Sequence, residues 1–189
     1  MSRGSYQRRY LRAPYKESVL YVDGPDILKG RAVNLSENGI LLDEIPNLPQ
    51  EETLQLLISV PTFPLMKNLS IAKLRAFDPA QLERKVVKVE ARLARKEELG
   101  KDLENLFKAR FGLEFVRVQT SDQEHIKSYV DAFAANLIHL QALIDSYNSD
   151  EDTRERTRAL ALALGYPAQE KIAQLRTQVS HDYNSLIWL

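Results

Sequence analysis

A chain of 189 residues is long enough for one large domain, or for one small domain with an appendage. Hydrophobic residues make up 44% of the sequence, which is enough for a packed core and argues against wholesale disorder. Lysine plus arginine number 26, as do aspartate plus glutamate, and this balance argues against general nucleic-acid or direct DNA binding. The absence of cysteine excludes disulfides, thiolate metal sites and cysteine nucleophiles.

The N-terminal stretch is charged and is not followed by an apolar run, so it does not have the pattern of a secretory signal. No apolar run approaches the ~20 residues that a helix needs to cross a bilayer. We therefore expect a cytoplasmic protein without membrane insertion.

The first 14 residues are expected to form a flexible basic arm that ends at Pro14. Residues 1–12 contain four arginines and no acidic residue, whereas residues 121–189 contain more acids than bases. This uneven distribution indicates separate roles for the two ends of the chain.

Residues 15–118 have the pattern of an all-β domain, because short apolar or alternating runs are separated by turn residues such as Asp23-Gly24-Pro25-Asp26. We expect strands at Ser18–Val22, Ile27–Val33, Gly39–Leu42, Thr53–Val60, Ser70–Phe77, Val86–Leu93 and Phe111–Val118. The charged residues 95–106 are expected to form a loop or a short helix. Six or seven short strands indicate a small closed barrel or a sandwich, and the helices that follow make the chain an α+β protein.

After residue 120 the apolar spacing becomes helical, and we expect a helical extension over 121–189. An apolar seam with 4-3 spacing indicates one helix over about 122–148, with Ser121 or Asp122 as its N-cap. The seam consists of Ile126, Val130, Phe133, Leu137, Leu140, Ile144 and Tyr147. A second helix is expected over Arg154–Leu164, and a third after Pro167.

The seam on the 122–148 helix has three interpretations. It packs within the chain, it forms a homo-oligomeric coiled coil, or it binds a protein partner. Tyr129, Ala134 and Ile138 widen the apolar stripe, which favours burial in a helical bundle.

Two short polar motifs flank the first predicted hairpin. Arg8 and Arg12 are four residues apart, and their guanidinium groups can bind phosphate, pair with the edge of a guanine, or stack on an aromatic ring. Taken alone, this pair has the simpler interpretation of a solvated basic tail.

The second motif is Asn34-x-Ser36-x-x-Gly39. Its simpler interpretation is turn chemistry, with local hydrogen bonds from Asn34 and Ser36 and a glycine at positive φ. Its functional interpretation places an amide and a hydroxyl at a strand end, beside a glycine that lets a ligand approach the backbone.

Together, the order and spacing of Arg8-xxx-Arg12 and Asn34-x-Ser36-xx-Gly39 over residues 6–118 resemble the PilZ domain, a β-barrel receptor for the bacterial second messenger cyclic di-GMP. The resemblance implies that Arg8 and Arg12 clamp phosphate and guanine and that Asn34 and Ser36 bond the base or phosphate. It also implies that Gly39, which has no side chain, keeps the wall of the binding site low beneath the ligand. Arg9 is a weaker candidate for contacting the ligand. Family members that take a stacked pair of ligands often have arginine where this chain has Gln7, which argues against the paired mode.

No catalytic or metal-binding pattern accompanies these motifs. The three histidines, His125, His139 and His181, stand apart from one another, and no common nucleotide-hydrolysis motif occurs. The resemblance therefore implies a non-enzymatic effector with no cofactor or metal, which converts binding of cyclic di-GMP into a conformational or interaction change sensed by a protein partner. The alternatives are a PilZ-fold adaptor in pilus or motility assembly that binds no nucleotide, and a nucleotide hydrolase.

Overall fold

The computed structural model describes residues 10–43, 45, 49–98, 109–148, 150–167 and 171–187. Its strands are β1 (Arg12–Pro14), β2 (Ser18–Asp23), β3 (Asp26–Ser36), β4 (Gly39–Asp43), β5 (Thr53–Pro61), β6 (Arg84–Glu98) and β7 (Ala109–Val118). Its α-helices are α1 (Ile71–Arg75), α2 (Thr120–Asp145), α3 (Glu151–Ala163) and α4 (Ile172–Ile187). The chain forms two compact units, the first from residues 12–62 and 84–130 and the second from residues 1–11, 63–83 and 131–189.

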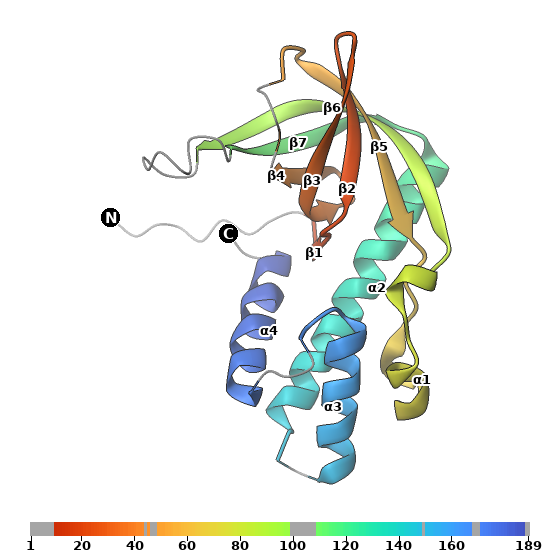
Figure 1. The fold of residues 1–189 in the computed structure, drawn as a ribbon, viewed down its shortest axis with the longest axis vertical. Coiled ribbons are helices and arrows are strands. Elements are labelled where there is room, and N and C mark those ends of the chain that lie inside the picture. Colours follow the sequence, from red (N-terminus) through yellow and green to blue (C-terminus); the bar gives the residue numbers. More distant parts are fainter. Residues whose placement is uncertain are drawn as a thin grey trace. The chain divides into compact units, whose positions relative to one another are not determined.

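The first unit is a closed antiparallel barrel (Figure 1). Six strands follow the order β3-β2-β5-β6-β7-β4, and β4 pairs again with β3 to close the ring. The short strand β1 pairs with residues 34–36 at the end of β3, beyond the residues of β3 that pair with β2. The predicted α+β architecture, a small six- or seven-stranded antiparallel barrel followed by helices, is confirmed.

Alternating burial explains why these segments form barrel strands. In β5, for example, every second residue points into the barrel and is at most 1% exposed, and these residues are Leu54, Leu56, Ile58 and Val60. The residues between them face outward, as a strand with one buried face requires.

The turn between β2 and β3 has the predicted composition, and Gly24 occupies it at a φ of 59°. Asp23 precedes this turn and is largely buried. Its carboxylate accepts hydrogen bonds from the backbone N–H groups of Gln50 and Glu51, both at 3.0 Å, so the loop before β5 is tied to the hairpin.

Two predictions between the strands were wrong. Ser70–Phe77 is not a strand, because Ile71–Arg75 forms α1 and the Ser70 hydroxyl caps it by accepting a hydrogen bond from the Lys73 N–H at 3.3 Å. Residues 95–98 are not a loop or helix but continue β6, paired with the start of β7.

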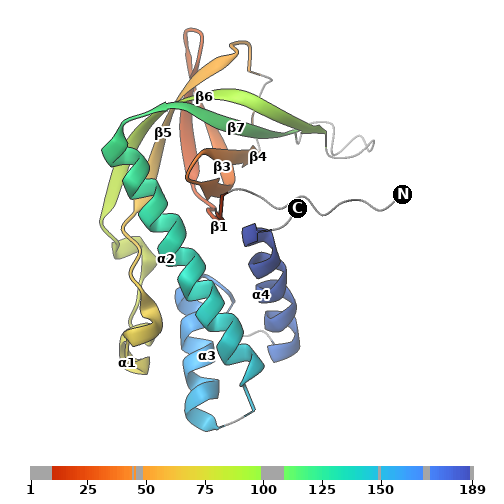
Figure 2. The ribbon, with the colours of Figure 1, turned by 180° about the vertical axis from the view of Figure 1, so that it is seen from behind.

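The second unit contains α1, α3, α4 and the later turns of α2, and Figures 1 and 2 both show α3 beside α1. Asn136, 1% exposed on α2, organises the segment before α1. Its Oδ1 accepts a hydrogen bond from the Met66 N–H and its Nδ2 donates one to the Pro64 carbonyl, each at 2.8 Å. This buried amide therefore satisfies a backbone segment that has no regular partner.

All seven residues of the α2 seam are buried within the single chain, none more than 8% exposed. This burial favours the interpretation that the seam packs intramolecularly. Of the three flanking residues, Tyr129 and Ala134 are also buried, whereas Ile138 is 50% exposed. The helix begins at Thr120, slightly before the expected N-cap residues.

None of the helices in the described ranges is both long enough and apolar enough to cross a membrane.

Candidate functional site

The pairing of β1 with β3 brings the two sequence motifs together. Arg12 lies directly opposite Ser36, and Pro14 lies directly opposite Asn34. Residues opposite each other in an antiparallel pair project from the same face, so Arg12, Asn34 and Ser36 share one face.

That face is the outer one. Ala13 and Leu35, which alternate with the motif residues and lie opposite each other, are both 0% exposed and belong to the barrel core. Arg12 and Asn34 are partly exposed, and Ser36 is 6% exposed. The strand pair therefore places a guanidinium, an amide and a largely buried hydroxyl on the outer face of the barrel. Groups of these kinds can bond an oxyanion or a base edge.

Ser36 also has a structural hydrogen bond. Its Oγ donates to the Gly39 carbonyl at 3.0 Å, across the turn that joins β3 to β4. The hydroxyl oxygen keeps its acceptor capacity, so Ser36 closes the hairpin and can still accept a hydrogen bond from a ligand.

Gly39 is required for a reason that the sequence does not reveal. It is not among the described glycines with positive φ. A Cβ atom at this position would lie 2.5 Å from the Leu113 carbonyl oxygen of β7, which is closer than real Cβ contacts. Gly39 therefore lets β4 and β7 pair closely.

The first turns of α2 contact both motif strands, and Figure 2 shows this helix leaving the end of β7 and running past β1. Tyr129 donates its hydroxyl to the Pro14 carbonyl at 2.9 Å. Gln123 donates its side-chain N–H to Asn38 Oδ1, in the β3–β4 turn, at 3.3 Å. The same helix segment is thus bonded to the base of the arginine strand and to the turn of the Asn-x-Ser-x-x-Gly motif.

A buried polar cluster supports this junction. Tyr15 and Tyr129 meet edge to face with ring centroids 5.8 Å apart, and the Tyr15 hydroxyl donates to the Ser59 carbonyl at 2.8 Å. Burial raises the pKa of both tyrosines, so both hydroxyls stay protonated and act as donors. Arg84 completes the cluster by bonding Ser59 and pairing with Glu17 at 2.8 Å.

The expected site residues have different outcomes. Arg12, Asn34, Ser36 and Gly39 lie together in the structure, whereas Arg8 and Arg9 lie outside the described residues. The expected flexible arm over 1–14 included Arg12–Pro14, which the structure places in β1.

Sequence reasoning missed the two contacts from α2. The sequence pattern places Tyr129 on the apolar stripe of the helix and gives no signal for Gln123. The one available signal was a tyrosine on an apolar helix face, since a buried tyrosine hydroxyl usually finds a hydrogen-bond partner.

Within the described ranges, no group of three or more histidine, aspartate or glutamate side chains is arranged to hold a metal ion. The donors of the candidate site are cationic or neutral, a set suited to an anionic ligand.

Several solved structures resemble this chain at low identity. The Bacillus subtilis inhibitor of motility, MotI/DgrA, is 18% identical with a TM-score of 0.47, and the match covers 67% of this chain and 50% of that chain. The PilZ domain of YcgR from Escherichia coli with c-di-GMP is 16% identical with a TM-score of 0.42, covering 67% of this chain and 90% of that chain. YcgR from Escherichia coli in complex with c-di-GMP is 15% identical with a TM-score of 0.40, covering 76% of this chain and 50% of that chain. This chain thus spans about half the length of the first of these proteins.

Among curated proteins, none matches the sequence significantly. The family model for the PilZ domain matches residues 6–132, which is more than half of the 189 residues. The matched segment contains both polar motifs and all seven strands. The chain therefore belongs to the PilZ domain family.

Proposed function

We propose that this protein is a cytoplasmic effector that binds cyclic di-GMP on the outer face of β1 and β3 and performs no catalysis. The observation that carries the proposal is the β1–β3 register, in which Arg12 lies opposite Ser36 and shares a face with Asn34. Membership of the PilZ family supports the choice of ligand, because that family includes receptors for this dinucleotide.

In the proposed mode of binding, the Arg12 guanidinium engages a phosphate or a guanine edge, and Asn34 and Ser36 bond the same ligand from β3. Arg8, with Arg9 in a lesser role, closes over the ligand from the N-terminal side. Ordering a residue of the arm costs about 1–2 kcal/mol, which charge-assisted hydrogen bonds and guanine stacking must outweigh. Arg12 lies in β1 and therefore adds nothing to that cost.

In this proposal, α2 transmits the effect of ligand binding from the site to a protein partner. Tyr129 and Gln123 bond Pro14 and Asn38, so a ligand that shifts β1 or the β3–β4 turn changes the partners of the first turns of α2. A protein partner that contacts this helix or the ordered arm then senses the change, as in other order–disorder switches.

The test is calorimetric titration of the full chain with cyclic di-GMP. We expect saturable binding by the wild-type protein, and Arg8→Ala, Arg12→Ala and Asn34→Ala should each weaken it by roughly tenfold to a hundredfold, the loss of a hydrogen bond to a charged group. Arg117→Ala is the matched control, because Arg117 is an exposed arginine on the same barrel whose ion pair with Glu90, at 3.1 Å, is a surface pair of small energetic value.

Equal affinity in the wild type and in both arginine variants would refute the assigned site. Absence of binding by the wild type would favour the alternative function, an adaptor in pilus or motility assembly. The structural roles of Ser36 and Gly39 are compatible with that alternative, since both serve the barrel itself. Conversion of cyclic di-GMP to a product on prolonged incubation would instead indicate a hydrolase.

A further inference from the structure

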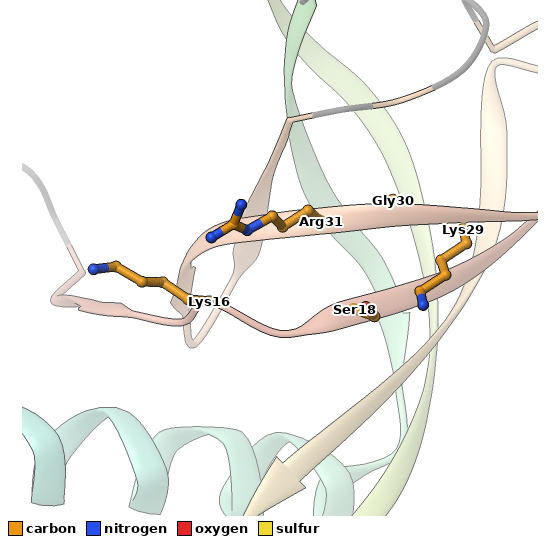
Figure 3. A pocket seen from close by; sticks show the side chains of 5 residues that line it. All are labelled: Lys16, Ser18, Lys29, Gly30 and Arg31. Carbon is orange, nitrogen blue, oxygen red and sulfur yellow. The ribbon is translucent and has the colours of Figure 1, made fainter. Parts of the chain in front are cut away.

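A second polar feature lies on the same wall of the barrel. A surface pocket of about 300 Å³ is lined by Lys16, Ser18, Lys29, Gly30 and Arg31 (Figure 3). This volume is at the lower end of the range for small-ligand sites. Figure 3 shows Lys16 and Arg31 extending in the same direction, while Lys29 bends toward β2, where Ser18 lies.

Strand register explains why these residues gather. Arg31 lies opposite Ser18, and Lys29 lies opposite Leu20, in the β2–β3 hairpin. Lys29 and Arg31 are two residues apart on β3, so both project outward. All three cationic side chains of the pocket are exposed.

Nearby acids neutralise only part of this charge. Glu17 is paired with Arg84 at 2.8 Å, and Asp43 lies opposite Arg31 on β4. Within the described part of the chain, neither Lys16 nor Lys29 has an ion-pair partner. The two lysines therefore supply charge that is available to an anion.

The pocket and the candidate site lie one after the other along β3. An irregularity in the β3–β4 pairing between Ala32 and Asn34 changes the phase of the strand. As a result Arg31 and Asn34, an odd number of positions apart, both face outward, while Ala32 and Leu35 face the core. The strand rise places Arg31 and Asn34 about 10 Å apart along β3, within reach of one ligand when the arginine side chain is extended.

We propose that the Lys16–Lys29–Arg31 pocket is a second anion subsite, which takes a phosphate group of a phosphodiester nucleotide. This inference rests on the proposed function. In a cyclic dinucleotide the two phosphates lie on opposite sides of one ring, so a ligand held by Arg12, Asn34 and Ser36 at one phosphate presents the other to a separate set of cations. The pocket supplies that set, together with the Ser18 hydroxyl as a donor.

The experiment is calorimetric titration with cyclic di-GMP of the wild-type protein and of a Lys16→Ala/Lys29→Ala double variant, at low and high salt. We expect the double variant to bind roughly tenfold to a hundredfold more weakly at low salt. Its affinity should also depend less on salt concentration, because fewer charges contribute to binding. Stoichiometry should stay unchanged, and a Lys16→Arg/Lys29→Arg variant should restore most of the affinity.

Lys88→Ala is the matched control, because Lys88 is an exposed lysine on the outer wall of the same barrel, on β6 rather than in the pocket. The subsite would be overturned if the double variant kept wild-type affinity and salt dependence while Arg12→Ala bound weakly. That result would leave the proposed function standing. Absence of binding by the wild-type protein would overturn both. A stoichiometry of two ligands in the wild type and one in the double variant would overturn the proposal that one ligand spans both sites.

Discussion

At the scale of single residues, the Asn-x-Ser-x-x-Gly motif combines two kinds of role. Asn34 is partly exposed on the outer face, where it is available to a ligand. Ser36 closes the hairpin through its bond to the Gly39 carbonyl, and Gly39 makes room for Leu113. Stability and binding therefore depend on different members of one short motif.

Replacing Gly39 by alanine is expected to lower the free energy of unfolding by about 1–3 kcal/mol, because a methyl group 2.5 Å from the Leu113 carbonyl oxygen forces β4 and β7 apart. Urea denaturation monitored by circular dichroism measures this change.

The matched control is Gly30→Ala on β3. Its new Cβ would meet only side-chain atoms, the nearest at 3.5 Å, so it should change stability much less. Equal stability of the Gly39→Ala and Gly30→Ala proteins would show that the β4–β7 contact does not constrain position 39.

At the scale of elements, α2 is the connection between the site and the rest of the barrel unit. Its first turns bond β1 through Tyr129 and the β3–β4 turn through Gln123. Asp122 adds an ion pair with Lys85 of β6 at 2.8 Å. One helix end is thus fastened to three separate parts of the barrel.

Removing the Tyr129 hydroxyl in Tyr129→Phe should lower the free energy of unfolding by about 1–2 kcal/mol, because the Pro14 carbonyl loses its buried donor. Hydrogen exchange should become faster at the amides of β1, since the helix no longer holds the strand that follows Arg12.

Tyr183→Phe provides the comparison, because the Tyr183 hydroxyl has no hydrogen-bond partner within the described ranges. If both tyrosine variants kept wild-type exchange rates in β1, the Tyr129–Pro14 bond would have no part in holding the strand.

At the scale of the whole molecule, stability should depend on the protonation of His139, a residue of α2 in the second unit. Burial lowers its pKa, and the positive charges of Arg156 and Lys67 lower it further. Its Nε2 is buried without a hydrogen-bond partner in the described part of the chain. The folded state therefore favours the neutral ring.

Because the pKa of His139 is lower in the folded chain than in the unfolded chain, its contribution to stability is fully present above the unfolded pKa of about 6.5 and is lost progressively as the pH falls from there through the lower folded pKa. We expect the wild-type protein to lose more stability than His139→Gln when the pH is lowered from 8 to 5. Thermal unfolding of both proteins across this range checks the difference, and parallel pH profiles would contradict it.

Most strands of the barrel could be predicted from the sequence because apolar alternation and turn residues are local features of the chain. Alternation in Thr53–Val60 and Val86–Leu93, and the turn at Gly24, correspond to β5, β6 and the β2–β3 turn. The strand predicted over Ser70–Phe77 is wrong because the apolar residues of this segment lie three apart, a spacing that suits a helix, and Ser70 caps that helix.

The parts of the candidate site that could not be predicted from the sequence depend on contacts between residues that are distant in sequence. Glycine is required at position 39 because the Leu113 carbonyl of β7 lies close to it. The Pro14 carbonyl is held by a hydrogen bond from Tyr129 of α2. The basic pocket joins Lys16, just before β2, to two cations on β3 through the β2–β3 register, which composition does not specify. The arginine spacing indicated a clamp, but only the β1–β3 pairing places Arg12 opposite Ser36.

The close passage of β7 beside Gly39 has a consequence for how relatives are recognised. A homologue that no longer binds a ligand would still need this glycine for β4 and β7 to pair and close the barrel. The glycine would therefore persist under selection for folding alone. Searches for genuine receptors should therefore give more weight to Arg12 and Asn34, whose conservation the architecture does not demand.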